Sequence, residues 1–222
     1  MEPLIFLGAI GLGMGRYIES MGGIPYIEFL ASGLIVTAAM YTAAFECTYG
    51  TFVRIEYEKV YDGILAAPVS VSDLFMGEML WAGTKGIFFS VVVAVVVTAL
   101  GILSPLTIPA AAAAGFLTAL MFSSLSLIVT SFIKDMNQFN FYHTGFLSPM
   151  FFFSGAIFTL DGLPGWVTIV SEALPLTHTV RMVRGVVFGS GYFGAADVLY
   201  ILVFIPVCAF IAIRRMRRKL LS

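Results

Sequence analysis

Long apolar runs separated by short polar joints dominate the pattern of this chain. A helix needs about 20 mainly apolar residues to cross a bilayer, so these runs predict membrane-spanning helices. We predict six spans, at about residues 1–15, 26–45, 79–103, 109–133, 139–160 and 195–213. The first run is shorter than a full span and starts abruptly with Glu2-Pro3. We therefore expect an N-terminally truncated first span.

The first of two longer polar stretches covers residues 46–74. Part of it carries apolar residues at helical spacing, namely Tyr57, Val60, Tyr61, Ile64 and Leu65. Pro68 ends this helix because proline lacks a backbone donor, and Ser70 and Asp73 are suited to cap the next one. Such a short amphipathic helix fits a groove of a partner protein or the lipid headgroups equally well.

The second polar stretch, residues 161–192, is too polar and too interrupted by proline to cross a membrane. Non-helical backbone within a bilayer must be surrounded by protein or by a wet cavity. We therefore predict a re-entrant pair of short helices that turn near Pro175 and dip into the outer leaflet.

Composition supports the same class of protein. Hydrophobic residues make up 59% of the 222 residues and charged residues 11%, against about 25% charged residues in soluble domains. We expect one all-α membrane domain, and the net charge of −1 gives no reason to expect a nucleic-acid partner. Cys47 and Cys208 have no partner at a motif spacing, so we interpret both as apolar fillers.

The basic residues predict the orientation, because lysine and arginine favour the cytoplasmic side. Placing the C-terminal tail in the cytoplasm puts nine basic residues inside and three outside. The inside group is Arg54, Lys59, Lys85, Lys134, Arg214, Arg215, Arg217, Arg218 and Lys219; the outside group is Arg16, Arg181 and Arg184. Both termini are therefore predicted to be cytoplasmic.

No motif for chemistry emerges from the sequence. A phosphate-binding loop needs a lysine directly after its last glycine, but Thr84 separates Gly83 from Lys85. The two histidines, His143 and His178, lack neighbours at metal-ligand spacing. We expect no catalytic, metal or cofactor-binding residue, and hence no enzyme.

Glu46 and Lys85 are the ionisable residues predicted to lie deepest in the bilayer. Charges at that depth are costly and suggest function. They either pair or reach for the interface, or they form a polar lock that changes partner between two states.

Three stretches of this chain resemble the type-2 ABC transporter permeases, in particular the nodulation-factor exporter and drug-efflux permease branch. They are Glu2 to Leu4 with Gly11 to Gly15; Phe45 to Gly50 with Arg54, Glu56, Tyr57, Leu65, Gly77, Glu78 and Trp81; and Phe153 to Gly155 with Leu163, Pro164, Leu174 to His178, Arg184 and Gly185. Members of this family usually begin with an amphipathic interfacial helix, which we do not find before the first run.

The resemblance implies a multi-pass permease of the plasma (inner) membrane that pairs with a second copy, most simply as a homodimer. It implies a separate ABC ATPase subunit that binds ATP and Mg, with no cofactor on this chain. The polar stretch 46–74 then resembles the loop that receives the ATPase motion, with coupling residues Arg54, Glu56, Tyr57, Val60, Tyr61, Ile64 and Leu65. The segment 161–192 resembles an extracellular re-entrant gate, with Leu163, Pro164, Trp166, Pro175, His178 and Arg184.

Two other functions remain as alternatives. An ion-gradient-driven carrier predicts ionisable residues at the membrane midplane and broken helices in repeated positions, and a membrane-bound enzyme predicts a catalytic constellation. For the substrate, Met- and aromatic-rich stretches such as Met150 to Phe153 fit an amphipathic, lipid-linked glycan or drug-like molecule. The same stretches fit contact with lipid tails.

Overall fold

The computed structural model describes residues 2–15, 17–160, 162–189 and 191–221, with the backbone alone for Glu2, Leu12 and Leu221. Arg16, which enters the charge count, lies outside the described residues. So does Asp161, where the predicted outer hairpin begins.

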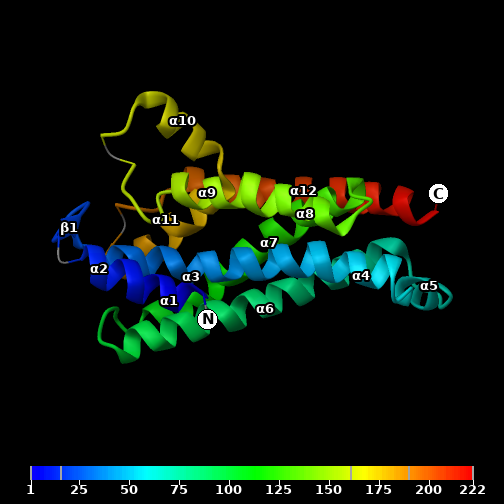
Figure 1. Cartoon of the computed structure of the whole chain (residues 1–222), viewed down its shortest axis with the longest axis horizontal. Coiled ribbons are helices and arrows are strands. Elements are labelled where there is room, and N and C mark those ends of the chain that lie inside the picture. Colours follow the sequence, from blue (N-terminus) through cyan, green and yellow to red (C-terminus); the bar gives the residue numbers. More distant parts are fainter. Residues whose placement is uncertain (1, 16, 161, 190, 222) are drawn as a thin grey trace.

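Helices make up most of the described chain and run roughly along one long axis (Figure 1). In chain order the elements are α1 (Glu2–Phe6), η1 (Leu7–Gly11), α2 (Leu12–Met14), β1 (Ser20–Met21), β2 (Ile24–Pro25), α3 (Tyr26–Phe45), η2 (Glu46–Gly50), α4 (Thr51–Glu56), α5 (Val60–Leu65), α6 (Val71–Ala99), α7 (Thr107–Phe132), η3 (Met136–Gln138), α8 (Phe139–Tyr142), η4 (His143–Leu147), α9 (Ser148–Phe153), α10 (Gly165–Ala173), α11 (Pro175–Phe188) and α12 (Ala195–Leu221). Figure 1 shows α4, α5 and the C-terminus at one end of the bundle, which we call the α5 end. We call the opposite end, with the antiparallel ribbon β1–β2 and the short helices α10 and α11, the hairpin end.

Four helices of the described chain are long and apolar enough to cross a membrane: Tyr26–Glu56, Val71–Ala99, Thr107–Phe132 and Ala195–Leu220. This confirms an all-α membrane protein, with β1–β2 as a minor addition. The predicted spans 1–15 and 139–160 correspond to shorter helical stretches, α1 to α2 and α8 to α9, each interrupted by a π turn.

The second predicted span differs most from the structure at its end. The helix does not stop at Phe45 but continues through the π turn η2 and α4 to Glu56. The polar residues Glu46 and Arg54 stay in a helix because each pairs with a charged residue of the same helix or of α6. The polar loop is accordingly much shorter than the predicted residues 46–74.

The next helix begins at Val71, eight residues before the predicted start at residue 79. Its first turn is held by a capping box, in which Asp73 N–H donates to Ser70 Oγ and Ser70 N–H donates to the Asp73 carboxylate. These are the two residues that the sequence indicated as a cap. Hydropathy missed the start because the first turns of α6 are polar.

The last two predicted spans also end elsewhere. α9 ends at Phe153, and the chain then turns at Gly155, whose positive φ of 79° suits glycine. α12 continues past residue 213 through the basic tail to Leu221. Basic residues near a helix C-terminus are favoured by the helix dipole, so the tail extends the helix.

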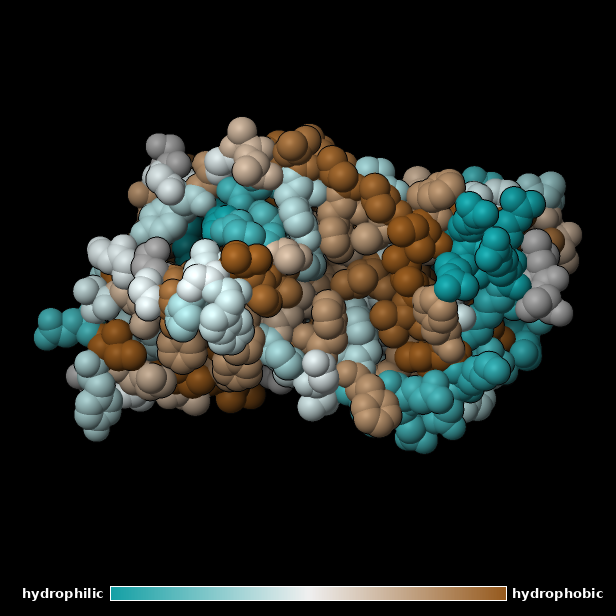
Figure 2. Space-filling view, turned by 90° about the horizontal axis from the view of Figure 1, so that it is seen from above, coloured by the Kyte–Doolittle hydropathy of each residue, from teal (hydrophilic) through white to brown (hydrophobic). Residues whose placement is uncertain are grey.

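Helices α3 and α7 form the centre of the bundle, and α12 lies at its periphery with most of its surface exposed. α6 and α7 cross closely where Gly86 and Ser90 meet Gly115 and Ala119. Ser90 Oγ also donates to the Ile35 carbonyl of α3 at 2.8 Å. Figure 2 shows hydrophobic side chains over the middle of the molecule and hydrophilic ones at the α5 end, as expected for a bilayer-embedded bundle.

Candidate functional site

A network of four charges lies near the α5 end, between the long helix that contains η2 and the neighbouring helix α6. Glu46 Oε1 lies 2.7 Å from Arg54 Nη2, and Glu46 Oε2 lies 2.6 Å from Lys85 Nζ. Arg54 Nη2 also lies 3.1 Å from Glu78 Oε2. The two acids and two bases balance, which reduces the cost of removing them from water.

Local sequence shapes this network. Glu46 and Arg54 lie eight residues apart on one helix, and Gly50 lies between them. A Cβ at Gly50 would come 3.1 Å from Arg54 Nη2 and 3.6 Å from Glu46 Oε1. A glycine there therefore leaves room for the ion pair.

The structure brings Glu46 and Lys85 together, although they are 39 residues apart. The pairing that the sequence offered as one interpretation is therefore present. Lys85 Nζ also lies 5.0 Å from the centroid of the Trp81 ring, one turn earlier on α6.

Helix α5 packs against the same region mainly through Tyr61, its fully buried side chain. Tyr61 is 1% exposed, and its ring meets Phe75 of α6 edge-on at a centroid distance of 5.8 Å. Burial, together with the negative charge of Glu78, raises the pKa of Tyr61. α5 is thus anchored beside the charged network.

The seven predicted coupling residues do not share one exposed helical face. Lys59 has a left-handed backbone (φ 53°) and separates α5 from the long helix that ends at Glu56. The predicted amphipathic helix is therefore divided between the end of this long helix and α5. Arg54 and Tyr61 point inward, Ile64 and Leu65 pack partly against the core, and Glu56 lies 3.8 Å from Lys219 Nζ. Tyr57 and Val60, 68% and 39% exposed, are the apolar residues left for a partner.

The two π turns η2 and η4 contact each other beside the charged network. Thr48 in η2 lies 3.1 Å from His143 Nε2 in η4, and the His143 ring stacks on Phe45 at 4.3 Å. Thr130 of α7 donates to the Cys47 carbonyl at 2.7 Å. π turns recur at functional sites. These contacts therefore join two helices at their irregular turns to the regular helix α7.

Sequence reasoning missed Glu78, Thr48 and Thr130 as parts of this site. Glu78 had a usable signal, because it precedes Lys85 by two helical turns and so lies on the same face of α6. Thr48 and Thr130 had none, since neither the π turns nor the close approach of α7 follow from local sequence.

The six predicted gate residues at the hairpin end divide into two groups. Leu163, Pro164 and Trp166 are exposed, at or just before the start of α10. Pro175, His178 and Arg184 are buried on α11. The two short helices meet at Leu174 and Pro175, near the predicted turn.

His178 ties three elements of the hairpin end together. Its Nε2 lies 3.0 Å from the Glu172 carbonyl of α10, and its Nδ1 lies 2.7 Å from Asp197 Oδ1 of α12. Arg181 pairs with both Glu172 and Asp197, and this guanidinium holds the pKa of Glu172 below its ordinary value. These contacts fix α10, which has little contact with the core, and the core-packed helix α11 to α12.

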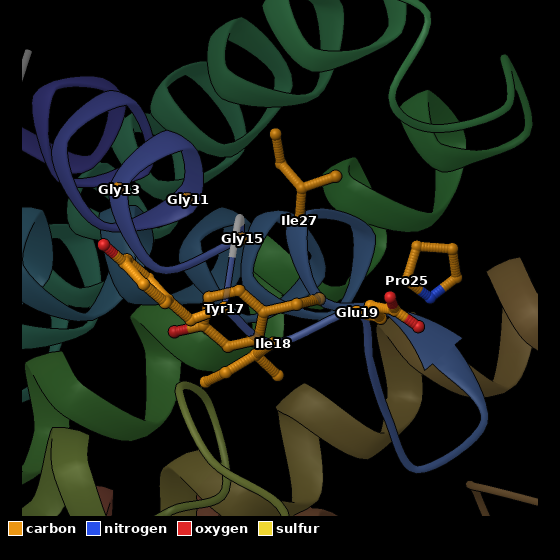
Figure 3. Close-up of a pocket in the computed structure, with 9 residues that line it drawn as sticks. Gly11, Gly13, Gly15, Tyr17, Ile18, Glu19, Pro25 and Ile27 are labelled. Atoms are coloured by element: carbon orange, nitrogen blue, oxygen red, sulfur yellow. The ribbon is translucent and has the colours of Figure 1, made fainter.

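Two cavities differ in their chemical character. One of about 820 Å³ lies between α1, α3, α6 and α9, with apolar walls and the Glu46–Lys85 pair on its lining. The other, of about 770 Å³, lies where α2 meets the β1–β2 ribbon; in Figure 3 Tyr17, Glu19 and Ile27 point in different directions. The second has no converging polar groups. Among the described residues, no group of three or more His, Cys, Asp or Glu could hold a metal ion.

Comparison with known proteins places this geometry in context. The sequence profile of the family described as ABC-2 type transporter matches residues 1–188. Nodulation protein J of Rhizobium meliloti (strain 1021) is 36% identical over 189 residues, 85% of this chain and 72% of that protein. Nodulation protein J of Rhizobium leguminosarum bv. trifolii is 34% identical over 221 residues, 99% of this chain and 84% of that protein. The inner membrane transport permease YadH of Escherichia coli (strain K12) is 26% identical over 202 residues, 89% of this chain and 75% of that protein.

Proposed function

Because this chain belongs to the ABC-2 type transporter family, we propose that it forms the translocation pathway of an ATP-driven exporter and receives motion from a separate ATPase at its α5 end. It is a multi-pass membrane subunit of an ABC transporter, and such subunits normally act with an ABC ATPase. ATP and Mg bind to that ATPase in this proposal, and this chain binds no cofactor.

The observation that carries the coupling proposal is the way α5 is anchored. Tyr57 and Val60 face outward, whereas Tyr61 packs on Phe75 beside the charged network. A push on the outer side of α5 reaches α6 directly through this aromatic contact. The ion pairs of Glu46 and Arg54 with α6 then pass the motion to α3.

Glu46 is suited to act as the proposed polar lock. Each of its carboxylate oxygens holds a different cation, Arg54 on its own helix and Lys85 on α6. A shift of α6 along α3 would release Lys85 while Arg54 stays bound. The charged residues would thus favour discrete positions of the two helices.

We propose that the chain crosses the plasma membrane six times, with both termini in the cytoplasm. The four long helices are joined in this arrangement by α1 to α2 and by α8 to α9. α10 and α11 then form the extracellular re-entrant hairpin. The excess of basic residues at the α5 end supports this orientation.

The cavity of about 820 Å³ supports an amphipathic substrate, such as a lipid-linked glycan or a drug-like molecule. Its apolar wall includes Leu34, Phe89 and Phe152, and its polar part includes Glu46 and Lys85. An apolar tail and a polar head would each find a matching surface. In the proposal a second copy of the chain completes the pathway.

The decisive experiment isolates the tagged chain from its native membrane and asks whether an ABC ATPase co-purifies. Val60→Glu places a charge on the exposed side of α5, and we expect it to lower ATPase recovery and ATP-dependent transport at least tenfold. The matched control is Val170→Glu on α10, which is similarly exposed at the opposite end and should leave ATPase recovery unchanged.

Normal ATPase recovery and normal transport by Val60→Glu would contradict the coupling role of α5. Transport that persists without ATP and stops when the ion gradient is collapsed would instead support the ion-gradient-driven carrier.

A further inference from the structure

A third cavity, of about 500 Å³, lies at the hairpin end among α3, α11, the start of α12 and the loops between them. Its lining includes Phe29, Thr177, Arg181, Arg184, Tyr192 and Asp197. It is separate from the apolar cavity near the α5 end and differs from it in being rich in hydrogen-bond donors.

Arg184 is a buried cation in this lining, and no described carboxylate lies within ion-pair distance of it. Its Nε donates to Ser32 Oγ at 3.1 Å, and its Nη2 donates to the carbonyls of Phe29 and Ala156 at 3.2 Å. Its Nη1 donates to no described residue. The guanidinium also lies 3.6 Å from the centroid of the Phe29 ring. The three acceptors and the ring are all neutral, so this side chain, 5% exposed, faces no described negative charge.

The other charges of the cavity do not compensate Arg184. Asp197 is already engaged by His178, by Arg181 and by the Gly194 N–H. Arg181 is balanced by Glu172 and Asp197. The two arginines and two carboxylates of this region balance in number, but both carboxylates lie on Arg181, so Arg184 has no ion-pair partner among the described residues.

Thr177 adds an independent indication. It is 1% exposed, lines the same cavity, and its Oγ1 is buried without a hydrogen-bond partner. A buried hydroxyl without a partner costs free energy unless something satisfies it. Thr177 and Arg184 thus both leave a donor unused at one cavity.

We propose that this cavity binds an oxyanion, a carboxylate or phosphate group, with Arg184 supplying the charge and Thr177 a second hydrogen bond. Guanidinium groups form strong charge-assisted bonds to such anions. The anion can be a free ion, a lipid headgroup or an acidic group of the transported molecule. Only the last source rests on the proposed function.

The test is a titration of the full chain in maltoside micelles, which contain no phosphate, with inorganic phosphate at constant ionic strength. The melting temperature is followed by the fluorescence of Trp81 and Trp166. We expect a saturable rise for the wild type. Thr177→Val, which loses one hydrogen bond to the anion, should raise the half-saturating concentration about fivefold.

Thr107→Val is the matched control, because Thr107 is also fully buried with an unpartnered hydroxyl but does not line this cavity. This variant should reach half-saturation at the same phosphate concentration as the wild type. Arg184→Gln should lose the saturable response; if that variant does not fold, the comparison of the two threonine variants decides. Phosphate also stabilises proteins non-specifically, and that effect would be linear and equal in all variants.

No saturable response in the wild type, or equal half-saturation in Thr177→Val and Thr107→Val, would overturn the proposal. Repeating the titration after adding phosphatidylglycerol identifies the source: loss of the phosphate response indicates a lipid headgroup, and an unchanged response indicates a soluble anion. The titration needs no ATPase, so failure of the proposed function would leave its result interpretable.

Discussion

The four charged residues near the α5 end are expected to contribute to the free energy of unfolding through their ion pairs. Glu46 accepts from two cations, whereas Glu78 is paired with Arg54 alone among the described residues. Removing one member of this partly buried ionic network leaves its partner unpaired where water solvates it only in part. The four charges should therefore contribute unequally to stability.

At this scale we expect Glu46→Gln to lower the free energy of unfolding by about 2 kcal/mol, because two charge-assisted bonds are weakened. Glu78→Gln should cost less. Thermal melting in detergent measures both. Adding Lys85→Gln to Glu46→Gln should restore part of the loss, since it removes the cation left unpaired.

Glu58 provides the control, because it is exposed at the same end and makes no ion pair with a described residue. Glu58→Gln should melt with the wild type. If Glu46→Gln melted as Glu58→Gln does, the network would not contribute to stability, and the lock would lose its energetic basis.

At the scale of the elements, the crossing of α6 and α7 depends on the absence of side chains. A Cβ at Gly115 would lie 2.7 Å from Ser90 Cβ and 2.9 Å from the Gly86 carbonyl oxygen. Small residues let membrane helices approach closely. The alanine run Ala110 to Ala114 lies on the same helix just before this point.

Gly115→Ala should therefore separate α6 from α7 and destabilise the chain by about 1–3 kcal/mol, the usual cost of overpacking. Gly77→Ala on α6 is the control, since a Cβ there meets nothing within 4 Å. Alanine favours the helix over glycine by about 0.5–1 kcal/mol, so the control should be neutral or slightly more stable. Opposite signs for the two variants in a denaturation series would support this packing; a stable Gly115→Ala would refute it.

For the whole molecule, the orientation in the membrane decides whether an ATPase could reach α5. Lys59 lies at the α5 end and Leu163 at the hairpin end. The native thiols of Cys47 and Cys208 are buried, so single engineered cysteines can be labelled against a low background.

We expect a membrane-impermeant maleimide to label Leu163→Cys in intact cells and Lys59→Cys after the membrane is permeabilised. As a control, both cysteine variants should be labelled once the membrane is permeabilised, which shows that each thiol is accessible to the reagent. Labelling of Lys59→Cys in intact cells would place α5 outside and rule out coupling to a cytoplasmic ATPase.

The sequence alone determined the class of protein, the family and the positions of most long helices. It did so because burial in lipid selects for uninterrupted apolar runs, which are a local property of the chain. The cap at Ser70 and Asp73 was equally predictable, since a capping box involves neighbouring residues. The same locality explains why the short helices meet near Pro175.

The tertiary structure decided how far the helices extend and which polar residues meet. Residues 46–56 remain helical because Glu46 finds Lys85 and Arg54 finds Glu78 on another helix. The helical spacing of apolar residues on α5 does not identify the partner of Tyr61. Its ring is buried because it packs against Phe75 of α6. Arg184 meets the carbonyls of Phe29 and Ala156, which lie 155 and 28 residues away in the sequence. Such contacts depend on how helices pack, and no local pattern of hydrophobic and polar residues encodes them.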